Sequence, residues 1–330
     1  MKPSDIVKAL HLLLDIQQPV FLWGPPGVGK SQVVAEVARK RGMELCDVRA
    51  VLLDPVDLRG LPLVTDKGLA QWCPPAFLPP EGSLSRGVVF LDELNAAPPL
   101  VQAACYQLIL DRRIGEYELP SGWSVVAAGN REKDRSVVHR MPTALANRMV
   151  HLEFEADLDD WLAWAAKHGI RPEVASFLRF RPALLHTFDP QSPDRTFASP
   201  RAWAFVSRML SASPAREIED ELWIGAVGMA AAAEFTGYLR IWRDLPGLDD
   251  VLADPEGVSV SQEPAVLYAL CEALASRACT DCADALGRFA LRLPPEFGVL
   301  LMRGCVCRER DFVKTEGFAR WAQANAEVLL

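Results

Sequence analysis

The sequence contains no apolar run long enough to cross a bilayer. The longest one, at about residues 224–235, includes Glu234 and is shorter than the roughly 20 apolar residues that a membrane helix needs. The first fifteen residues carry Asp5 and Asp15 and lack the apolar core and small-residue cleavage site of a signal peptide. We therefore expect a cytoplasmic protein, in which the eight cysteines are reduced thiols.

The sequence also lacks an excess of positive charge. It has 35 Lys and Arg residues against 43 Asp and Glu, which gives a formal net charge of -8. Such a chain is not attracted to phosphate backbones, so we do not expect a nucleic-acid partner. The chain also has no internal repeat and no low-complexity segment, and its 330 residues suggest about two domains.

Four cysteines near the C-terminus form two short motifs. They are C-T-D-C and C-V-C, at Cys279, Cys282, Cys305 and Cys307. Their spacing fits no common zinc pattern. We interpret them as small residues on packed helices, with a zinc site as the alternative.

Residues 1–155 alternate between strand-like and helix-like runs. Strands are expected at residues 19–23, 44–50, 87–91, 125–128 and 150–154, and helices at 31–41 and from Pro98 or Pro99 onward. The apolar run at 87–91 is typical of a strand buried on both faces. Strands separated by helices predict an α/β domain with a parallel sheet flanked by helices.

Residues 156–330 lack strand signals and predict an all-helical region. Helices are expected at residues 157–168, 172–180, 200–210, 217–242, 264–278, 282–291 and 312–329. Breaks rich in Pro and Asp at residues 189–199 and 244–264 separate some of them.

The strongest motif is G-P-P-G-V-G-K-S, which lies between an apolar strand and a helix. This is the context of a phosphate-binding P-loop, in which glycines let backbone N–H groups converge on phosphates at a helix N-terminus. Lys30 is expected to reach the β- and γ-phosphates, and the Ser31 hydroxyl to bind Mg²⁺. The predicted nucleotide-binding residues are Gly24, Pro25, Pro26, Gly27, Val28, Gly29, Lys30, Ser31, Gln32 and Asp92.

The second motif is V-V-F-L-D-E, an apolar strand that ends in two acids. Asp92 is then at the carboxyl end of a strand, where open α/β sheets bind ligands, and can complete the Mg²⁺ site with Ser31. Glu93 is expected to polarise the attacking water as a general base. Alone the pair would be read as a solvated strand end, but the upstream P-loop favours catalysis.

Three further polar residues are candidates for catalysis. Asn130 ends another apolar strand, where its amide can hydrogen-bond the γ-phosphate or the attacking water. Arg148 precedes the last strand, and Arg201 begins a helix of the second region. A guanidinium matches the charge that spreads over the γ-phosphate oxygens, although most arginines make surface ion pairs instead.

These motifs occur in the order of an AAA+ ATPase. The P-loop, D-L-R-G-L-P at residues 57–62, L-D-E-L-N at 91–95 and M-P-T-A-L-A-N-R at 141–148 resemble the MoxR family, and more narrowly its NorQ and CbbQ subgroup. The resemblance covers about residues 18–210. It implies an AAA+ nucleotide-binding domain at residues 1–155, and a helical lid with a helical extension at 156–330.

The resemblance also implies roles and partners. Asn130 would be sensor 1, Arg148 the arginine finger acting on a neighbour's ATP, with Arg140 as its rival, and Arg201 sensor 2. It implies ATP and Mg²⁺ as cofactors, a homo-oligomeric ring that is expected to be a hexamer, and a protein client. The family usually works with a von Willebrand factor A domain protein. This sequence has no D-x-S-x-S metal motif of that domain, so such a partner would be a separate chain.

Two insertions are read as hairpins, at residues 61–72 with a turn at 66–68 and at 113–124 with a turn at 120–122. In MoxR-like proteins such hairpins face the ring pore; alternatively, they only cap the sheet.

The leading interpretation is an ATP-hydrolysing chaperone that remodels a client complex. The alternatives are a nucleotide-gated scaffold, a GTP-using motor and a nucleic-acid motor. Glu93 argues against a scaffold, and the overall acidity argues against a nucleic-acid motor. The nearest match to the guanine-reading N-K-x-D motif has Arg131 in place of the lysine.

Overall fold

The computed structural model describes residues 1–134 and 141–325, and the chain forms two compact units. The first unit comprises Met1–Asp160 together with Phe188–Pro193. The second comprises Trp161–Thr187 and Asp194–Leu330. The main boundary therefore lies after Asp160, a few residues beyond the one placed after residue 155 from the sequence.

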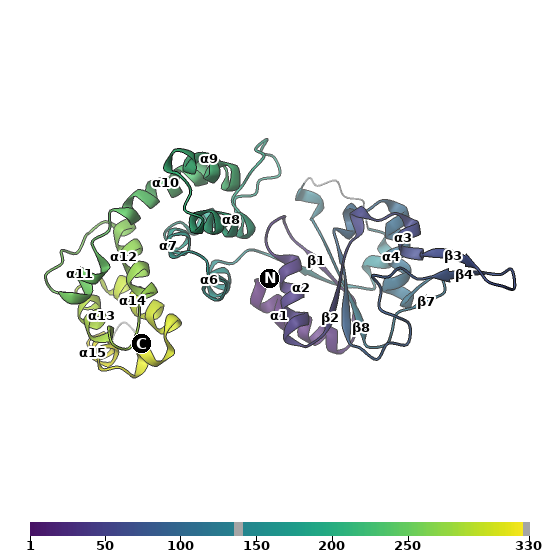
Figure 1. The fold of residues 1–330 in the computed structure, drawn as a ribbon, viewed down its shortest axis with the longest axis horizontal. Helices are drawn as coiled ribbons and strands as arrows, with labels where there is room; N and C mark the ends of the chain where they lie inside the picture. The colour runs from purple at the N-terminus through teal and green to yellow at the C-terminus, as the bar shows by residue number, and fades with distance from the viewer. Residues whose placement is uncertain (135–140, 326–330) are drawn as a thin grey trace. The chain divides into compact units, whose positions relative to one another are not determined.

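A five-stranded parallel sheet forms the centre of the first unit (Figure 1). The order of its strands is β2-β5-β8-β1-β9. Its strands are β1 (Val20–Trp23), β2 (Glu44–Arg49), β5 (Gly87–Asp92), β8 (Trp123–Gly129) and β9 (Val150–Glu153). The predicted parallel α/β sheet is confirmed.

Both faces of this sheet are covered by helices. They are α1 (Pro3–Asp15), α2 (Lys30–Lys40) and α4 (Pro99–Asp111). Alternate residues of β5 enter two cores: Val88 and Phe90 pack with α1 and α2, whereas Val89 and Leu91 pack with α4. This burial on both faces explains the continuous apolar run, because successive side chains of a strand point to opposite faces.

Two antiparallel hairpins extend from the first unit. The first pairs β3 (Leu61–Val64) with β4 (Ala70–Cys73), and Gly68 takes a positive φ of 72° at the predicted turn. The second pairs β6 (Arg113–Ile114) with β7 (Tyr117–Glu118), so its turn lies at Gly115, with a φ of 59°. The turn predicted at residues 120–122 is therefore wrong; that segment leads into β8.

Two short helices complete the first unit, α3 (Pro55–Arg59) and α5 (Thr143–Ala146). A capping box fixes the start of α3, in which Asp54 and Asp57 exchange bonds with each other's backbone.

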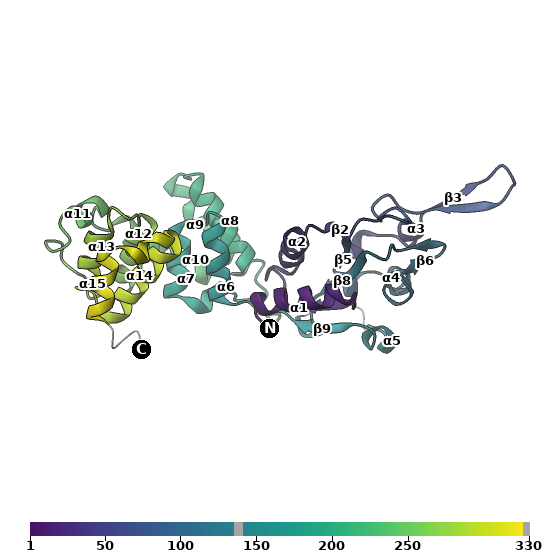
Figure 2. The same cartoon turned by 90° about the horizontal axis from the view of Figure 1, so that it is seen from below.

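The described part of the second unit is helical, as predicted. Its helices are α6 (Leu158–Lys167), which begins in the first unit, α7 (Pro172–Phe180), α8 (Pro200–Ser211), α9 (Arg216–Val227), α10 (Met229–Arg243), α11 (Leu248–Ala253), α12 (Pro264–Ser276), α13 (Ala283–Ala290), α14 (Pro295–Arg308) and α15 (Glu316–Ala324) (Figure 2). An aromatic cluster formed by Phe177, Trp203, Phe235 and Tyr238 packs α7, α8 and α10 together.

Three details of the helical region differ from the sequence expectation. The single helix predicted at residues 217–242 is two helices, because Gly228 has a φ of 84° and a ψ of 160° between α9 and α10. Helices α11 and α14 were not predicted. The helix expected at 312–329 is α15 in its described part, and residues 326–330 lie outside the described ones.

Between residues 1 and 134 and between 141 and 325, no helix combines the length and the apolar character needed to span a bilayer.

Candidate functional site

The predicted phosphate-binding residues lie in the loop after β1 and in the first turn of α2. The loop holds Gly24, Pro25, Pro26, Gly27, Val28 and Gly29, and the helix begins with Lys30, Ser31 and Gln32. Gly27 and Gly29 take positive φ angles of 80° and 105°, which residues with a Cβ atom rarely adopt. A Cβ atom on Gly24 would lie 2.8 Å from the carbonyl oxygen of Phe154. The glycines are therefore required by the shape of the loop.

Lys30 joins this loop to the end of β8. Its ammonium group donates to the carbonyl oxygen of Gly24 at 2.6 Å, to that of Pro25 at 3.1 Å, and to Oδ1 of Asn130 at 3.1 Å. Lys30 and Asn130 are 100 residues apart in the chain. The parallel sheet brings them together because β1 and β8 are neighbours and end at the same edge.

Ser31 joins the start of α2 to the end of β5. Its hydroxyl donates to Oδ2 of Asp92 at 2.8 Å. Glu93, the residue that follows β5, is exposed and has a φ of 55°, in the left-handed region that is uncommon outside glycine. Its backbone N–H donates to Oδ1 of Asp92 at 3.0 Å. Unusual backbone of this kind gathers at functional sites, which supports the role predicted for Glu93.

Asn95 is a site residue that the sequence analysis did not assign, although it ends the L-D-E-L-N motif. Its side chain is 3% exposed, and its amide nitrogen donates to the carbonyl oxygen of Asn130 at 2.6 Å. A Cβ atom on Gly129 would lie 2.1 Å from its Oδ1. Asn95 thus connects the turn that carries Glu93 to the segment that carries Asn130.

The segment after Asn130 is fixed by an ion pair. The guanidinium of Arg131 contacts the buried carboxylate of Asp134 at 3.0 Å, and Asp134 also accepts the backbone N–H of Arg131. The arginine that distinguishes this segment from a guanine-reading motif therefore has a local structural role.

The side chains at this edge fit a nucleotide with its magnesium ion. Ser31 and Asp92 offer a hydroxyl and a carboxylate, the hard oxygen ligands that Mg²⁺ takes together with phosphate oxygens and water. The pKa of the Asp47 carboxyl is raised, first by its partial burial and then by the nearby charge of Asp92. The carboxylates of Asp47 and Asp92 therefore lie close enough to repel each other, and a divalent cation bound at Asp92 would offset that repulsion. No cluster of three or more His, Cys, Asp or Glu residues suited to a metal occurs in the described ranges.

The end of α5 is linked to the strand that precedes the P-loop. The indole N–H of Trp23 donates to Nδ1 of His151 at 2.8 Å, so Nε2 carries the ring proton and donates to the carbonyl oxygen of Ala146 at 2.8 Å. Arg148 follows Ala146 by two residues. It is exposed, and within the described residues its guanidinium makes no ion pair. Arg140, the rival finger, lies outside the described residues.

Arg201 belongs to the second unit, where it is exposed in the first turn of α8. Ser199 caps that helix by accepting the N–H of Ala202 at 3.2 Å. The role of Arg201 toward a nucleotide stays a prediction.

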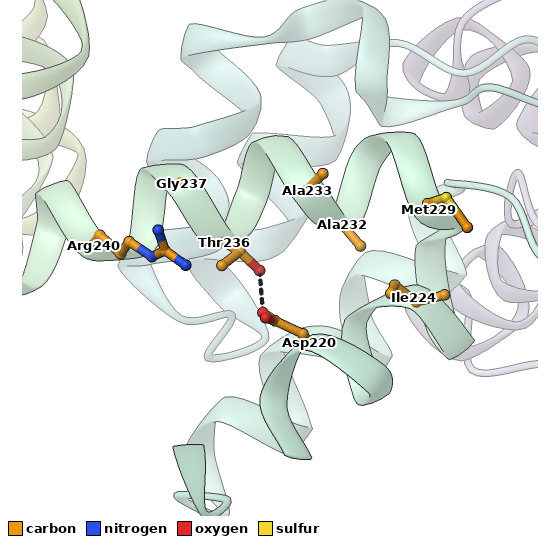
Figure 3. Close-up of a pocket in the computed structure, with 8 residues that line it drawn as sticks. All are labelled: Asp220, Ile224, Met229, Ala232, Ala233, Thr236, Gly237 and Arg240. Atoms are coloured by element: carbon orange, nitrogen blue, oxygen red, sulfur yellow. Dashed lines mark hydrogen bonds between the residues drawn. The ribbon is translucent and has the colours of Figure 1, made fainter. Parts of the chain in front are cut away.

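A shallow groove lies in the second unit between α9 and α10 (Figure 3). The hydroxyl of Thr236 donates to the Asp220 carboxylate at 2.7 Å across it, so these two polar groups already satisfy each other. The groove is lined by Asp220, Ile224, Met229, Ala232, Ala233, Thr236, Gly237 and Arg240. It holds none of the predicted site residues.

The sequence comparison decides the class of the first unit. Residues 19–149 match a family described as the AAA domain of the dynein-related subfamily. The first unit contains an AAA+ ATPase domain. The matched AAA+ range begins before β1 and ends just before β9, so it includes the P-loop, Asp92, Glu93, Asn130 and Arg148.

Solved structures resemble the chain only distantly. A mutant form of RuvB from Thermotoga maritima is 19% identical, with 82% of each chain covered and a TM-score of 0.43. NtrX of Brucella abortus in complex with ADP is 13% identical, with 99% of this chain and 68% of that chain covered and a TM-score of 0.43. No curated protein matches the chain. These values identify neither a substrate nor a partner for this chain.

Proposed function

We propose that this chain is an ATP-hydrolysing remodelling ATPase of the MoxR type, which acts on a protein client as a homo-oligomeric ring of six copies. The observation that carries the proposal is the pair of hydrogen bonds Lys30–Asn130 and Ser31–Asp92. They gather groups suited to bind phosphate, magnesium and water from two strand ends and one helix start.

The chemistry follows from these groups. Backbone N–H groups of the P-loop and the ammonium of Lys30 hold the phosphates, and Ser31 and Asp92 hold Mg²⁺, which neutralises phosphate charge when bound. Glu93 orients a water molecule and accepts its proton. Asn130 positions that water or the γ-phosphate, and Asn95 keeps Asn130 in place through its backbone.

The remaining steps need a second copy of the chain. Arg148 is exposed and its guanidinium is not engaged by the described residues, which suits a group that stabilises charge on a neighbour's ATP. Arg201 is proposed to act on the ATP of its own chain. ATP bound between copies would then couple hydrolysis to movement of the ring.

The proposed contact with a protein client is argued from the hairpin β3–β4. Its exposed aliphatic side chains are Leu61, Leu63, Val64 and Leu69, with Val64 78% exposed. Unpaired apolar side chains on a two-stranded insertion suit contact with another protein. We propose that this hairpin faces the pore, and that a separate von Willebrand factor A domain protein links the ring to its client.

ATP turnover by the purified full chain tests the enzymatic part. The wild type is expected to hydrolyse ATP with Mg²⁺, and Glu93→Gln to bind ATP yet turn over at least about a hundredfold more slowly, because the general base is lost. Glu44→Gln is the matched control, since Glu44 is an exposed acid that begins a strand of the same sheet. Equal turnover by Glu93→Gln and the wild type would contradict the assignment. Parallel assays with GTP and with added DNA or RNA address the alternatives.

A further inference from the structure

The short segment between α12 and α13 holds two thiols in contact. The Sγ atoms of Cys279 and Cys282 lie 3.0 Å apart, and the thiol of Cys279 donates to the sulfur of Cys282. The backbone N–H of Cys279 also donates to that sulfur at 3.1 Å. The spacing C-x-x-C therefore places both sulfurs side by side at the start of α13.

Rigid neighbours hold this arrangement. Cys282 is the N-cap of α13, whose Leu286 and Phe289 are fully buried. A Cβ atom on Gly287 would lie 2.6 Å from the carbonyl oxygen of Gly317, so α13 packs closely against the start of α15. Because the helices at both ends are packed, the two thiols need little movement to react with each other.

The two thiols differ in their surroundings. Cys279 is exposed, whereas Cys282 is half-buried. Burial raises the pKa of the Cys282 thiol to about 11. Cys282 therefore stays protonated near neutral pH, and Cys279 is the thiol that an oxidant in solution reaches first.

We propose that Cys279 and Cys282 form a redox-active dithiol that reduces hydroperoxides and closes to an intrachain disulfide. The Cys279 thiol first releases its proton, and its thiolate attacks the hydroxyl-bearing oxygen of the peroxide; an S–O bond forms and the O–O bond breaks. The other oxygen takes up the released proton and leaves as water or alcohol. Cys279 is then a sulfenic acid. The sulfur of Cys282 attacks it; the S–S bond forms, the S–O bond breaks, and the oxygen leaves as water with the proton of Cys282.

The rest of the chain supplies internal controls. Cys73 and Cys307 are also exposed, but in the described structure neither has a second sulfur at hydrogen-bond distance. Cys271 and Cys305 are buried, and burial raises the pKa of both thiols, that of Cys305 to about 12. Oxidation is thus expected to be specific to the dithiol.

Intact mass and peptide mapping of the full chain, reduced and then treated with equimolar hydrogen peroxide, test the proposal. The wild type is expected to lose the mass of two hydrogen atoms, to show a Cys279–Cys282 cross-link, and to recover both thiols with dithiothreitol. Cys73→Ser is expected to behave the same. Cys282→Ser should instead accumulate a sulfenic acid at Cys279 that dimedone traps, because no second thiol is present to resolve it.

Two results would overturn the proposal. One is wild-type protein in which Cys73 and Cys307 lose their thiols as fast as Cys279 and no cross-link forms. The other is one bound equivalent of zinc that Cys279→Ser removes, since the pair would then be a metal site. Neither measurement depends on ATP, so failure here is distinguishable from failure of the proposed ATPase activity.

Discussion

Lys30 and Asn95 show how single side chains connect the strand ends of the AAA+ domain. Lys30 was identified from its motif, whereas the role of Asn95 was found only in the structure. Asn95 ends the L-D-E-L-N motif, but nothing in that motif shows what its amide contacts. The role of Asn95 follows from its 2.6 Å hydrogen bond to the carbonyl oxygen of Asn130, a residue 35 positions away in the chain.

Lys30→Ala tests the binding role of the P-loop. Removing its charge is expected to weaken ATP binding by about tenfold to a hundredfold, the usual effect of losing a hydrogen bond to a charged group. Calorimetry with ATP and Mg²⁺ measures it. Lys40→Ala is the control, because Lys40 ends the same helix and pairs with Glu36 on the surface. Unchanged affinity in Lys30→Ala would refute the P-loop assignment.

Asn95→Asp tests the link between the two catalytic turns. The aspartate keeps the shape but loses the donor and faces the carbonyl oxygen of Asn130, so we expect turnover to fall about tenfold with ATP affinity little changed. Steady-state kinetics and calorimetry separate the two effects. Asn325→Asp is the matched control, since Asn325 also donates to a backbone oxygen, that of Trp321, but in the second unit. If both variants lose turnover equally, the link has no special role.

At the scale of elements, periodicity and flanking residues predicted the parallel sheet and most helices. They failed where glycine decided the path of the chain. The apolar pattern is continuous across α9 and α10, but Gly228 takes backbone angles that other residues avoid. The second hairpin turns at Gly115 rather than near Pro120, because Leu119 still bonds to Arg112 across it. Helix α14 was missed although Pro295 starts it.

Gly228→Ala tests the break between α9 and α10. A Cβ atom there would lie 2.9 Å from the carbonyl oxygen of Thr196, and the backbone angles strongly favour glycine. We expect a loss of stability of about 1–3 kcal/mol, seen as a lower Tm. Gly225→Ala, inside α9 with no atom within 4 Å of the added Cβ, is expected to leave Tm unchanged or raise it. A Gly228→Ala protein as stable as Gly225→Ala would show that the break is not required.

In the proposed mechanism, the whole molecule works with more than one copy of the chain. The P-loop, Asp92, Glu93 and Asn130 gather at one edge of one sheet, but Arg148 lies after α5, exposed and without an ion pair among the described residues. The sequence could predict an arginine finger only through the family resemblance. The reason is that the partner of an exposed arginine is decided by how the copies of the chain assemble.

We propose that ATP is hydrolysed at a site completed by a neighbouring copy of the chain, and mixing two impaired variants shows whether it is. Arg148→Ala is expected to bind ATP normally and to hydrolyse it about a thousandfold more slowly or worse, the scale of a lost arginine finger. Lys30→Ala loses the contact that binds and positions the β- and γ-phosphates, so its own site is expected to hydrolyse ATP poorly, but it keeps its finger. In mixed rings verified by two affinity tags, some sites pair an intact P-loop with an intact finger, and ATP turnover is predicted to return in part. Verified mixed rings that stay as inactive as either variant alone would contradict the account.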